Sequence, residues 1–235
     1  GVDSINVDLV YGLPHQTEET LARTIASVID LAPERLALFG YAHVPWMAKR
    51  QKLIDEETLP GPAARKAQAT LAREMLVTAG YRPIGIDHFA KPSDSLAKAA
   101  EAGTLRRNFQ GYTTDPAEAL IPFGASAIGW LPQGYIQNDP ATAVYQAKIE
   151  TGQLAIAKGI ALGLDDRVRA EAIEQVLCHF QLDPARLVAR YGDFAKPVAE
   201  TAREILAGAP EGALLPRGED GFEIAPEWRA YARLV

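Results

Sequence analysis

The alternation of apolar and polar residues predicts a strand, a helix and a second strand near the start of the chain. The stretch INVDLV, residues 5–10, has the two-residue period of a strand and ends in the turn Gly12-Leu13-Pro14. Thr17 suits the N-cap of a helix over 18–31, whose apolar residues share one face. Residues 36–41 are apolar and predict a second buried strand. The short links predict a βαβ unit with parallel strands.

The next segment predicts helices separated by short strands. Pro62 begins and Gly80 ends an Ala-rich helix. The apolar residues around 84–86 predict a third strand, which Pro83 confines to an edge or an end. A short helix over 95–102 follows, capped by Ser93 or Asp94. The stretch LIPFGASAIGW, residues 120–130, predicts a further strand or strand-like segment, and a helix follows at about 140–152.

The pattern changes after about residue 160. Helices are predicted over 165–180, 184–191 and 197–207, followed by a hairpin over 214–224 with its turn at 218–221. Three helices and a hairpin are the parts of a winged-helix-like module. We therefore expect an α/β domain over 1–158 and a small helical, winged-helix-like domain over 159–235.

The stretch RNFQGYTT, residues 107–114, has neither a helical period nor a clean alternation. It is expected to be a loop in which Phe109 and Tyr112 stand among amides, threonines and the two cations Arg106 and Arg107. A loop with this chemistry is expected to contact something other than its own core.

Composition narrows the class of protein. Of 235 residues 48% are apolar, and 24 basic against 30 acidic residues give a net charge of −6, which disfavours nucleic-acid binding by the winged-helix-like part. No apolar run is long enough to span a membrane, and no signal peptide opens the chain. A single Cys excludes a disulfide framework and fits a reducing cytoplasm. We expect a cytoplasmic protein without nucleic-acid or membrane partners.

A few polar residues follow predicted strands, where ligands gather in α/β folds. Asp8, placed at the carboxyl end of the first strand, either accepts hydrogen bonds from a ligand or caps the following turn. His43 after the second strand either binds a ligand or is structural, and the structural role is favoured. Asp87 and His88 could form an oriented imidazole pair. Cys178 is expected to be a packing residue. Neither a zinc spacing nor a G-x-S-x-G, G-x-G-x-x-G or Walker A sequence occurs.

Five segments together resemble the oxygen-independent coproporphyrinogen III oxidases, a family of radical S-adenosylmethionine enzymes. They are VDLVYGLPHQT, FGYAHVP, GYRPIGIDHFAKPSDSLAKA, LRRNFQGYTT and GASAIG. The resemblance covers residues 4–160 most clearly. It implies the second part of a partial (β/α) barrel followed by a small carboxy-terminal domain.

The resemblance also implies a reaction and its cofactors. Two propionates of coproporphyrinogen III lose CO₂ and become vinyl groups, which gives protoporphyrinogen IX in haem biosynthesis. The family uses a [4Fe–4S] cluster, two S-adenosylmethionine molecules and an electron donor, and the full-length protein is expected to be a monomer. Residues matching S-adenosylmethionine contacts are Asp8, Ala42, Phe109, Gln110 and Ile128.

Charge alone suggests that Arg106 and Arg107 pair with substrate propionates, although both could be solvated.

The sequence lacks parts of the family's pattern, among them the glycine-rich and acidic S-adenosylmethionine contacts of the first half of the barrel. The C-x-x-x-C-x-x-C motif that binds the cluster is missing, and one Cys cannot replace it. The chain also begins inside a predicted strand. We therefore expect a carboxy-terminal piece of an enzyme, inactive alone, or one half of a split protein. The alternative function is that of a haem chaperone of the same superfamily, against which RNFQGYTT and GIDHFAKP speak.

Overall fold

Residues 4–234 are described by a computed structural model, in which the chain forms two units. The first unit ends at Thr114 and the second begins at Asp115, and each is described here by itself. The fold is mixed α/β, as predicted. The first predicted strand was expected to start close to Gly1, and residues 1–3 lie outside the described part. The domain boundary between 158 and 159 stays a prediction.

The first unit is built on a four-stranded sheet of order β1-β2-β4-β3 and a two-stranded hairpin, β5-β6. Its elements are β1 (Asn6–Tyr11), α1 (Glu18–Leu31), β2 (Arg35–Gly40), the 3-10 helices η1 (Lys49–Leu53) and η2 (Glu56–Thr58), α2 (Pro62–Thr78), β3 (Arg82–Ile84), β4 (His88–Ala90), α3 (Ser95–Glu101), β5 (Arg106–Asn108) and β6 (Gly111–Thr113).

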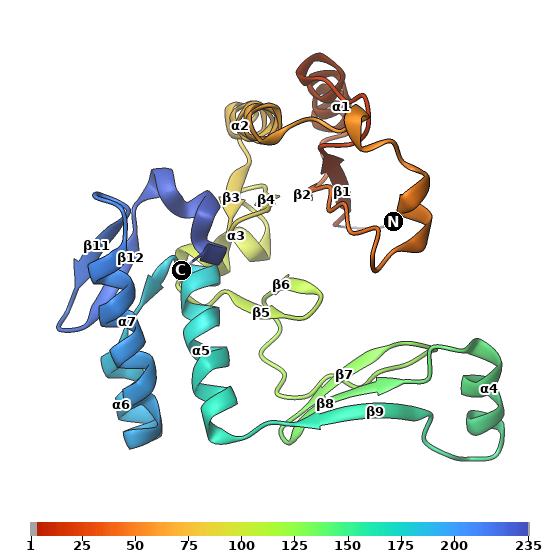
Figure 1. Ribbon diagram of the computed structural model, residues 1–235, viewed down its shortest axis with the longest axis vertical. Coiled ribbons are helices and arrows are strands. Elements are labelled where there is room, and N and C mark those ends of the chain that lie inside the picture. The colour runs from red at the N-terminus through yellow and green to blue at the C-terminus, as the bar shows by residue number, and fades with distance from the viewer. Residues whose placement is uncertain (1–3, 235) are drawn as a thin grey trace. The chain divides into compact units, whose positions relative to one another are not determined.

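The predicted βαβ unit is confirmed. β1 and β2 are parallel, with Asn6 opposite Arg35 and Tyr11 opposite Gly40. α1 covers the residues predicted for it, and Thr17 forms a capping box with Thr20. α1 and α2 lie side by side over one face of the sheet (Figure 1). Their buried residues form the core together with Tyr81, which precedes β3, and with buried residues of the sheet: Leu21, Ile25, Val28, Ala72, Leu76, Tyr81, Leu36, Leu38 and Phe89.

The remaining strands of this sheet run antiparallel. β3 lies at the edge, as Pro83 predicted, because proline has no N–H to donate to a second neighbour. β4 was not predicted. It pairs with both β2 and β3, so that residues 82–90 form a hairpin rather than one strand.

The stretch RNFQGYTT was expected to be a loop, and this prediction is wrong for most of its length. β5 and β6 pair in an antiparallel hairpin, with Arg106 opposite Thr113 and Arg107 opposite Tyr112. Only Phe109 and Gln110 stand at the turn. The strands are three residues long, which is too short for an alternating pattern to be visible in the sequence.

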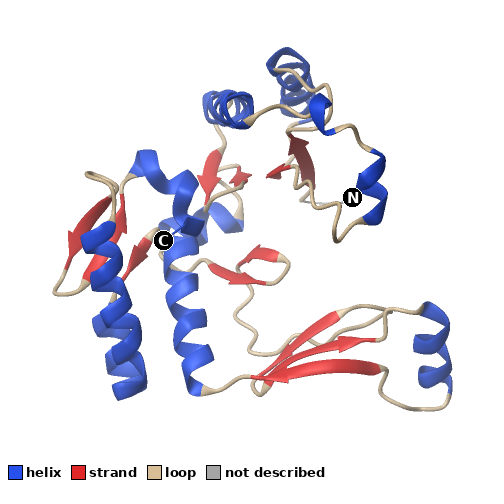
Figure 2. Ribbon diagram, viewed as in Figure 1, coloured by secondary structure: helices blue, strands red, loops and turns tan. Residues whose placement is uncertain are grey.

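The second unit begins with a three-stranded antiparallel sheet and one helix, β7 (Ile128–Leu131), β8 (Gly134–Asn138), α4 (Thr142–Glu150) and β9 (Ile156–Ala161). Figure 2 shows α4 beyond one end of these strands. The strand predicted over 120–130 is confirmed only from Ile128. Pro122 interrupts it, and Leu120 forms a single bridge to Trp130. β9 was not predicted; all six of its residues are exposed, so no apolar alternation marks it.

The rest of the second unit matches the predicted helices and hairpin within one or two residues. It contains α5 (Leu164–His179), β10 (Gln181–Leu182), α6 (Pro184–Tyr191), the 3-10 helix η3 (Gly192–Ala195), α7 (Lys196–Gly208), β11 (Leu214–Arg217), β12 (Gly221–Ile224) and the 3-10 helix η4 (Pro226–Leu234). The strands form a sheet of order β10-β12-β11. Cys178 is buried in α5, as predicted. Across residues 4–234 the helices are too short or too polar to cross a membrane.

Candidate functional site

The four-stranded sheet has two chemically different faces. Val7, Leu9 and Tyr11 of β1 pack on the core under α1 and α2. Because side chains alternate along a strand, Asp8 and its even-numbered neighbours in β1 point to the opposite face, where they are exposed. We call this the second face; its members are Asn6, Asp8, Val10, Ala37, Phe39 and His88.

Asp8 and His88 belong to one row across the second face. Asp8 is in register with Ala37, and Ala37 is in register with His88. Neighbouring strands are about 4.8 Å apart, so the Cα atoms of Asp8 and His88 are about 10 Å apart. Asp8 was expected at the carboxyl end of its strand, and this is wrong, because β1 continues to Tyr11. The Asp8 carboxylate accepts a 2.7 Å hydrogen bond from Asn6 Nδ2 and remains exposed.

Asp87 and His88 form the pair that the sequence suggested. The Asp87 Oδ1 to His88 Nδ1 distance is 2.7 Å, and the two side chains are 15% and 13% exposed. The His88 ring meets Phe39 and Tyr112 edge to face, with ring centroids 5.8 and 5.1 Å apart. These contacts fix the orientation of the imidazole. Within residues 4–234 the His88 side chain forms one hydrogen bond, through Nδ1.

Tyr112 joins the hairpin to this pair. Its hydroxyl oxygen accepts a hydrogen bond from the Ile86 backbone N–H at 3.1 Å. Gly85, at φ +56°, permits this approach, since a Cβ there would lie 2.0 Å from the Tyr112 ring. The guanidinium carbon of Arg107 lies 5.0 Å from the centroid of the same ring. Tyr112 is therefore in contact with both His88 and Arg107.

Arg107 carries a buried donor without an acceptor. Its Nη1 is inaccessible to solvent and forms no hydrogen bond within the described residues. A buried donor without a partner costs about 1–3 kcal/mol, and more when the group is charged. Arg106 and Arg107 are adjacent in the sequence, and both were expected to pair with substrate propionates. The hairpin separates them, because neighbouring residues of β5 point to opposite faces.

The turn of the hairpin presents the other two predicted residues. Phe109 is 42% exposed, although aromatic residues are usually buried, and Gln110 is exposed beside it. The Gln110 backbone N–H donates to Asn108 Oδ1 at 2.8 Å, which stabilises the turn and leaves the Gln110 side chain outside the hairpin. Both side chains are thus available to a ligand.

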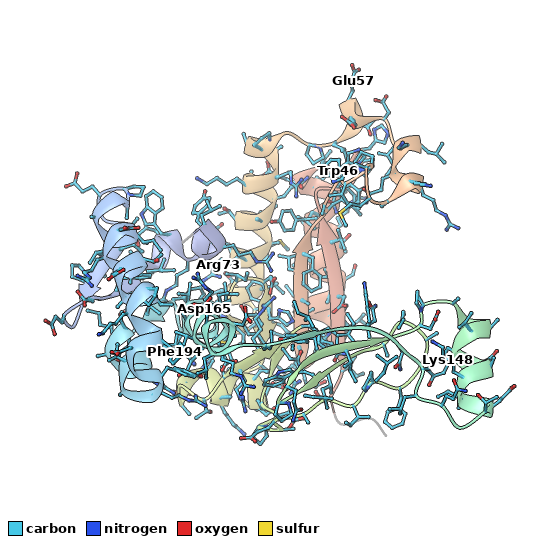
Figure 3. The ribbon with its side chains drawn as sticks, turned by 60° about the horizontal axis from the view of Figure 1, so that its bottom comes forward. Trp46, Glu57, Arg73, Lys148, Asp165 and Phe194 are labelled. Carbon is cyan, nitrogen blue, oxygen red and sulfur yellow. The ribbon has the colours of Figure 1, made fainter. Side chains whose placement is uncertain are left out.

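The segment after β2 holds Ala42 and His43. The Ala42 carbonyl accepts a hydrogen bond from Gln51 Nε2 at 3.0 Å. His43 lies 3.4 Å from the Tyr41 hydroxyl and 3.1 Å from Glu56, which fits the structural role favoured for it. Trp46 and Glu57 extend from the same segment between β2 and α2 (Figure 3), and Trp46 is 74% exposed.

The remaining predicted residue is in the second unit. Ile128 begins β7 opposite Gln137 and is half-buried. The first unit therefore brings together Asp8, Asp87, His88, Arg107 and Tyr112. Tyr112 is recognisable in the sequence as an aromatic residue among polar ones. No sequence pattern indicates that it contacts both Arg107 and His88.

The donor set for an iron–sulfur cluster is absent from residues 4–234. Among these residues no three His, Cys, Asp or Glu side chains are grouped to hold a metal. The chain has one Cys, Cys178, which is buried in α5. A cubane cluster takes thiolate ligands, so these residues do not fit it. An exposed carboxylate at Asp8 does fit the hydroxyl and ammonium groups of S-adenosylmethionine.

Solved structures define the class of fold. A solved structure titled "Coproporphyrinogen III oxidase (HemN) from Escherichia coli is a Radical SAM enzyme" superposes with a TM-score of 0.89 and 36% sequence identity, over 99% of this chain and 54% of that one. Over nearly its whole length the chain therefore has the fold of a radical S-adenosylmethionine enzyme. No protein-family model matches it.

Curated relatives identify the family. An oxygen-independent coproporphyrinogen III oxidase of Cereibacter sphaeroides is 49% identical over all of this chain and 52% of its own length. One of Thermostichus vulcanus is 38% identical over 99% of this chain and 72% of its own length. The chain belongs to the oxygen-independent coproporphyrinogen III oxidase family. It spans about half the length of the Cereibacter relative.

Proposed function

We propose that this chain forms part of an enzyme that converts coproporphyrinogen III to protoporphyrinogen IX by radical S-adenosylmethionine chemistry. Two substrate propionates lose CO₂ and become vinyl groups in this reaction. The single observation that carries the proposal is the second face, where Asp8 is an exposed carboxylate and His88 is oriented by Asp87, together with the buried Arg107 nitrogen against Tyr112, in a chain of this family.

The proposed roles follow the chemistry of each residue. Asp8 accepts hydrogen bonds from the second of two S-adenosylmethionine molecules, which Ala42 also contacts, and Phe109 and Gln110 contact S-adenosylmethionine from the turn of the hairpin. Ile128 contacts the first molecule.

Arg107 pairs with a substrate propionate, and Arg106 with a different one, because the two side chains leave opposite faces of the hairpin.

The cofactor supplies the radical, and this chain supplies binding groups only. The [4Fe–4S] ligands are proposed to lie outside this chain, since its residues do not fit them. The architecture is proposed to be part of a (β/α) barrel, supported by the parallel β1-α1-β2 unit. The winged-helix-like assignment is supported by three helices with the sheet β10-β12-β11. The same proposal includes an external electron donor. It also places the complete protein in the cytoplasm as a monomer.

The test is an anaerobic conversion assay with the complete protein. Coproporphyrinogen III, S-adenosylmethionine and a low-potential reductant are added, and tetrapyrroles are analysed after oxidation. We expect protoporphyrin to appear as the tetracarboxylate disappears. The alternative function, haem transport, has no support specific to this chain. Stable haem binding with no vinyl product would overturn the enzymatic proposal in its favour.

A further inference from the structure

Two side-chain nitrogens without a hydrogen-bond partner among residues 4–234 belong to groups that lie against the same aromatic ring. One is Nη1 of Arg107, which is buried without an acceptor among the described residues. The other is Nε2 of His88, whose ring is held through Nδ1 by Asp87. The Arg107 guanidinium carbon and the His88 ring are 5.0 and 5.1 Å from the Tyr112 centroid. Tyr112 is therefore in contact with both groups.

The space beside His88 Nε2 is bounded by Gly111. A Cβ at this position would lie 3.5 Å from Nε2 and 3.7 Å from Cε1, in van der Waals contact with the outer edge of the ring. Glycine leaves that volume open. The backbone of Gly111 has a φ of +142°, which other residues rarely adopt, so the hairpin itself requires glycine here.

A carboxylate matches this pair of donors. It has two oxygens and accepts hydrogen bonds from both sides, and arginine is well suited to bind it. Because Nδ1 is hydrogen-bonded to Asp87, Nε2 carries a hydrogen only in the imidazolium form.

We infer that His88 Nε2 and Arg107 Nη1 together bind one carboxylate of the substrate, with Asp87 as the positioning residue and Tyr112 in contact with both groups. This inference deepens the proposed function, and it rests on that function for the identity of the ligand as a porphyrinogen propionate. The site is selective for the ionised acid, because an ester has no charge to pair with the Arg107 guanidinium.

Two replacements of His88 separate the role of each ring nitrogen. The amide nitrogen in H88Q reaches the place of Nε2 and retains a donor to the ligand. The amide in H88N reaches only the place of Nδ1 and retains the contact to Asp87. H179N, which removes a histidine in the second unit, is the control.

The experiment measures anaerobic equilibrium binding to the complete protein with coproporphyrinogen III and with its tetramethyl ester. We expect H88N to weaken binding of the acid about tenfold and to leave ester binding unchanged, whereas H88Q and H179N retain the wild-type ratio of acid to ester affinity within about threefold. A misfolded variant would lose both ligands equally. An unchanged ratio in H88N would falsify the inference.

A second measurement does not depend on the substrate. Glutarate is titrated into the wild-type protein and into R107A while the nitrogen resonances of His88 are followed. We expect a saturable shift of Nε2 that R107A abolishes; no shift in the wild type overturns the carboxylate site. If the wild-type protein shows this shift but neither binds nor converts coproporphyrinogen III, the proposed function fails and the carboxylate site stands.

Discussion

Arg35 in β2 binds both carboxylate oxygens of Asp94, which also caps α3. Arg35 Nε lies 2.9 and 2.8 Å from Asp94 Oδ1 and Oδ2, and Leu96 N donates to Oδ1 at 2.7 Å. The Asp94 side chain is 4% exposed and that of Arg35 is 30% exposed. One carboxylate thus connects the sheet to the start of the helix that precedes the hairpin.

Loss of this carboxylate is expected to destabilise the first unit. D94A removes the partner of a mostly buried arginine and the helix cap, and we expect the free energy of unfolding to fall by about 3 kcal/mol. D94N retains an oxygen for the Leu96 N–H and should lose less. Urea unfolding of the two variants is the measurement. Equal losses would show that the charge contributes nothing.

Gly85 is expected to be irreplaceable because of the ring that it faces. A Cβ at Gly85 would lie 2.0 Å from Tyr112, whereas one at Gly80 would meet nothing within 4 Å. Both glycines have positive φ, so G85A and G80A share the backbone strain of about 1 kcal/mol. We expect G85A to lower the melting temperature much further than G80A and to weaken acid binding. Similar melting temperatures would contradict the contact.

His179 is expected to make the stability of the second unit depend on pH. Burial lowers the pKa of His179 below its usual value near 6.5, and the charge of Arg186 lowers it further. The unfolded chain therefore binds a proton at a pH where the folded chain does not. This contribution to stability is complete above about pH 7 and is lost as the pH falls from 6.5 to the folded-state pKa. In H179Q, urea titrations between pH 7 and pH 5 should show a smaller decrease.

Arg106 and Arg107 are expected to act on different carboxylates of the substrate. They leave opposite faces of the hairpin, so each replacement by Ala should weaken binding of coproporphyrinogen III independently. We expect the double variant to equal the sum of the two changes in binding free energy within about 0.5 kcal/mol. Coupling well above that value would mean that both cations bind one group, against the alternation seen in β5.

Local signals in the sequence were sufficient to predict several elements. The N-cap residue Thr17 and the apolar face of the residues that follow it predicted α1. Both signals are local, because capping and helical periodicity act within a few residues. Pro83 placed β3 at an edge, since a missing N–H has the same consequence in any sheet. The family motifs also directed attention to Asp8 and to the hairpin residues.

The arrangement of the site could not be predicted in this way. Asp8 and His88 share a row only because both are in register with Ala37, and register between distant strands leaves no local pattern. The contact between Tyr112 and His88 joins two three-residue strands, which are too short to be detected from alternation. The sequence feature most closely related to this contact is Gly85. Its role can be recognised only once the position of the Tyr112 ring is known.

The two-faced sheet has a consequence for any saturation mutagenesis of this chain. Along β1, odd-numbered positions should tolerate little and report on protein abundance, while even-numbered positions should leave abundance intact and report on haem-pathway complementation. Along β2, Leu36, Ala37 and Leu38 are buried and belong to the abundance class, whereas Phe39, which is half-buried, belongs to the complementation class. Odd and even numbers would then sort the phenotypes of β1, and burial would sort those of β2.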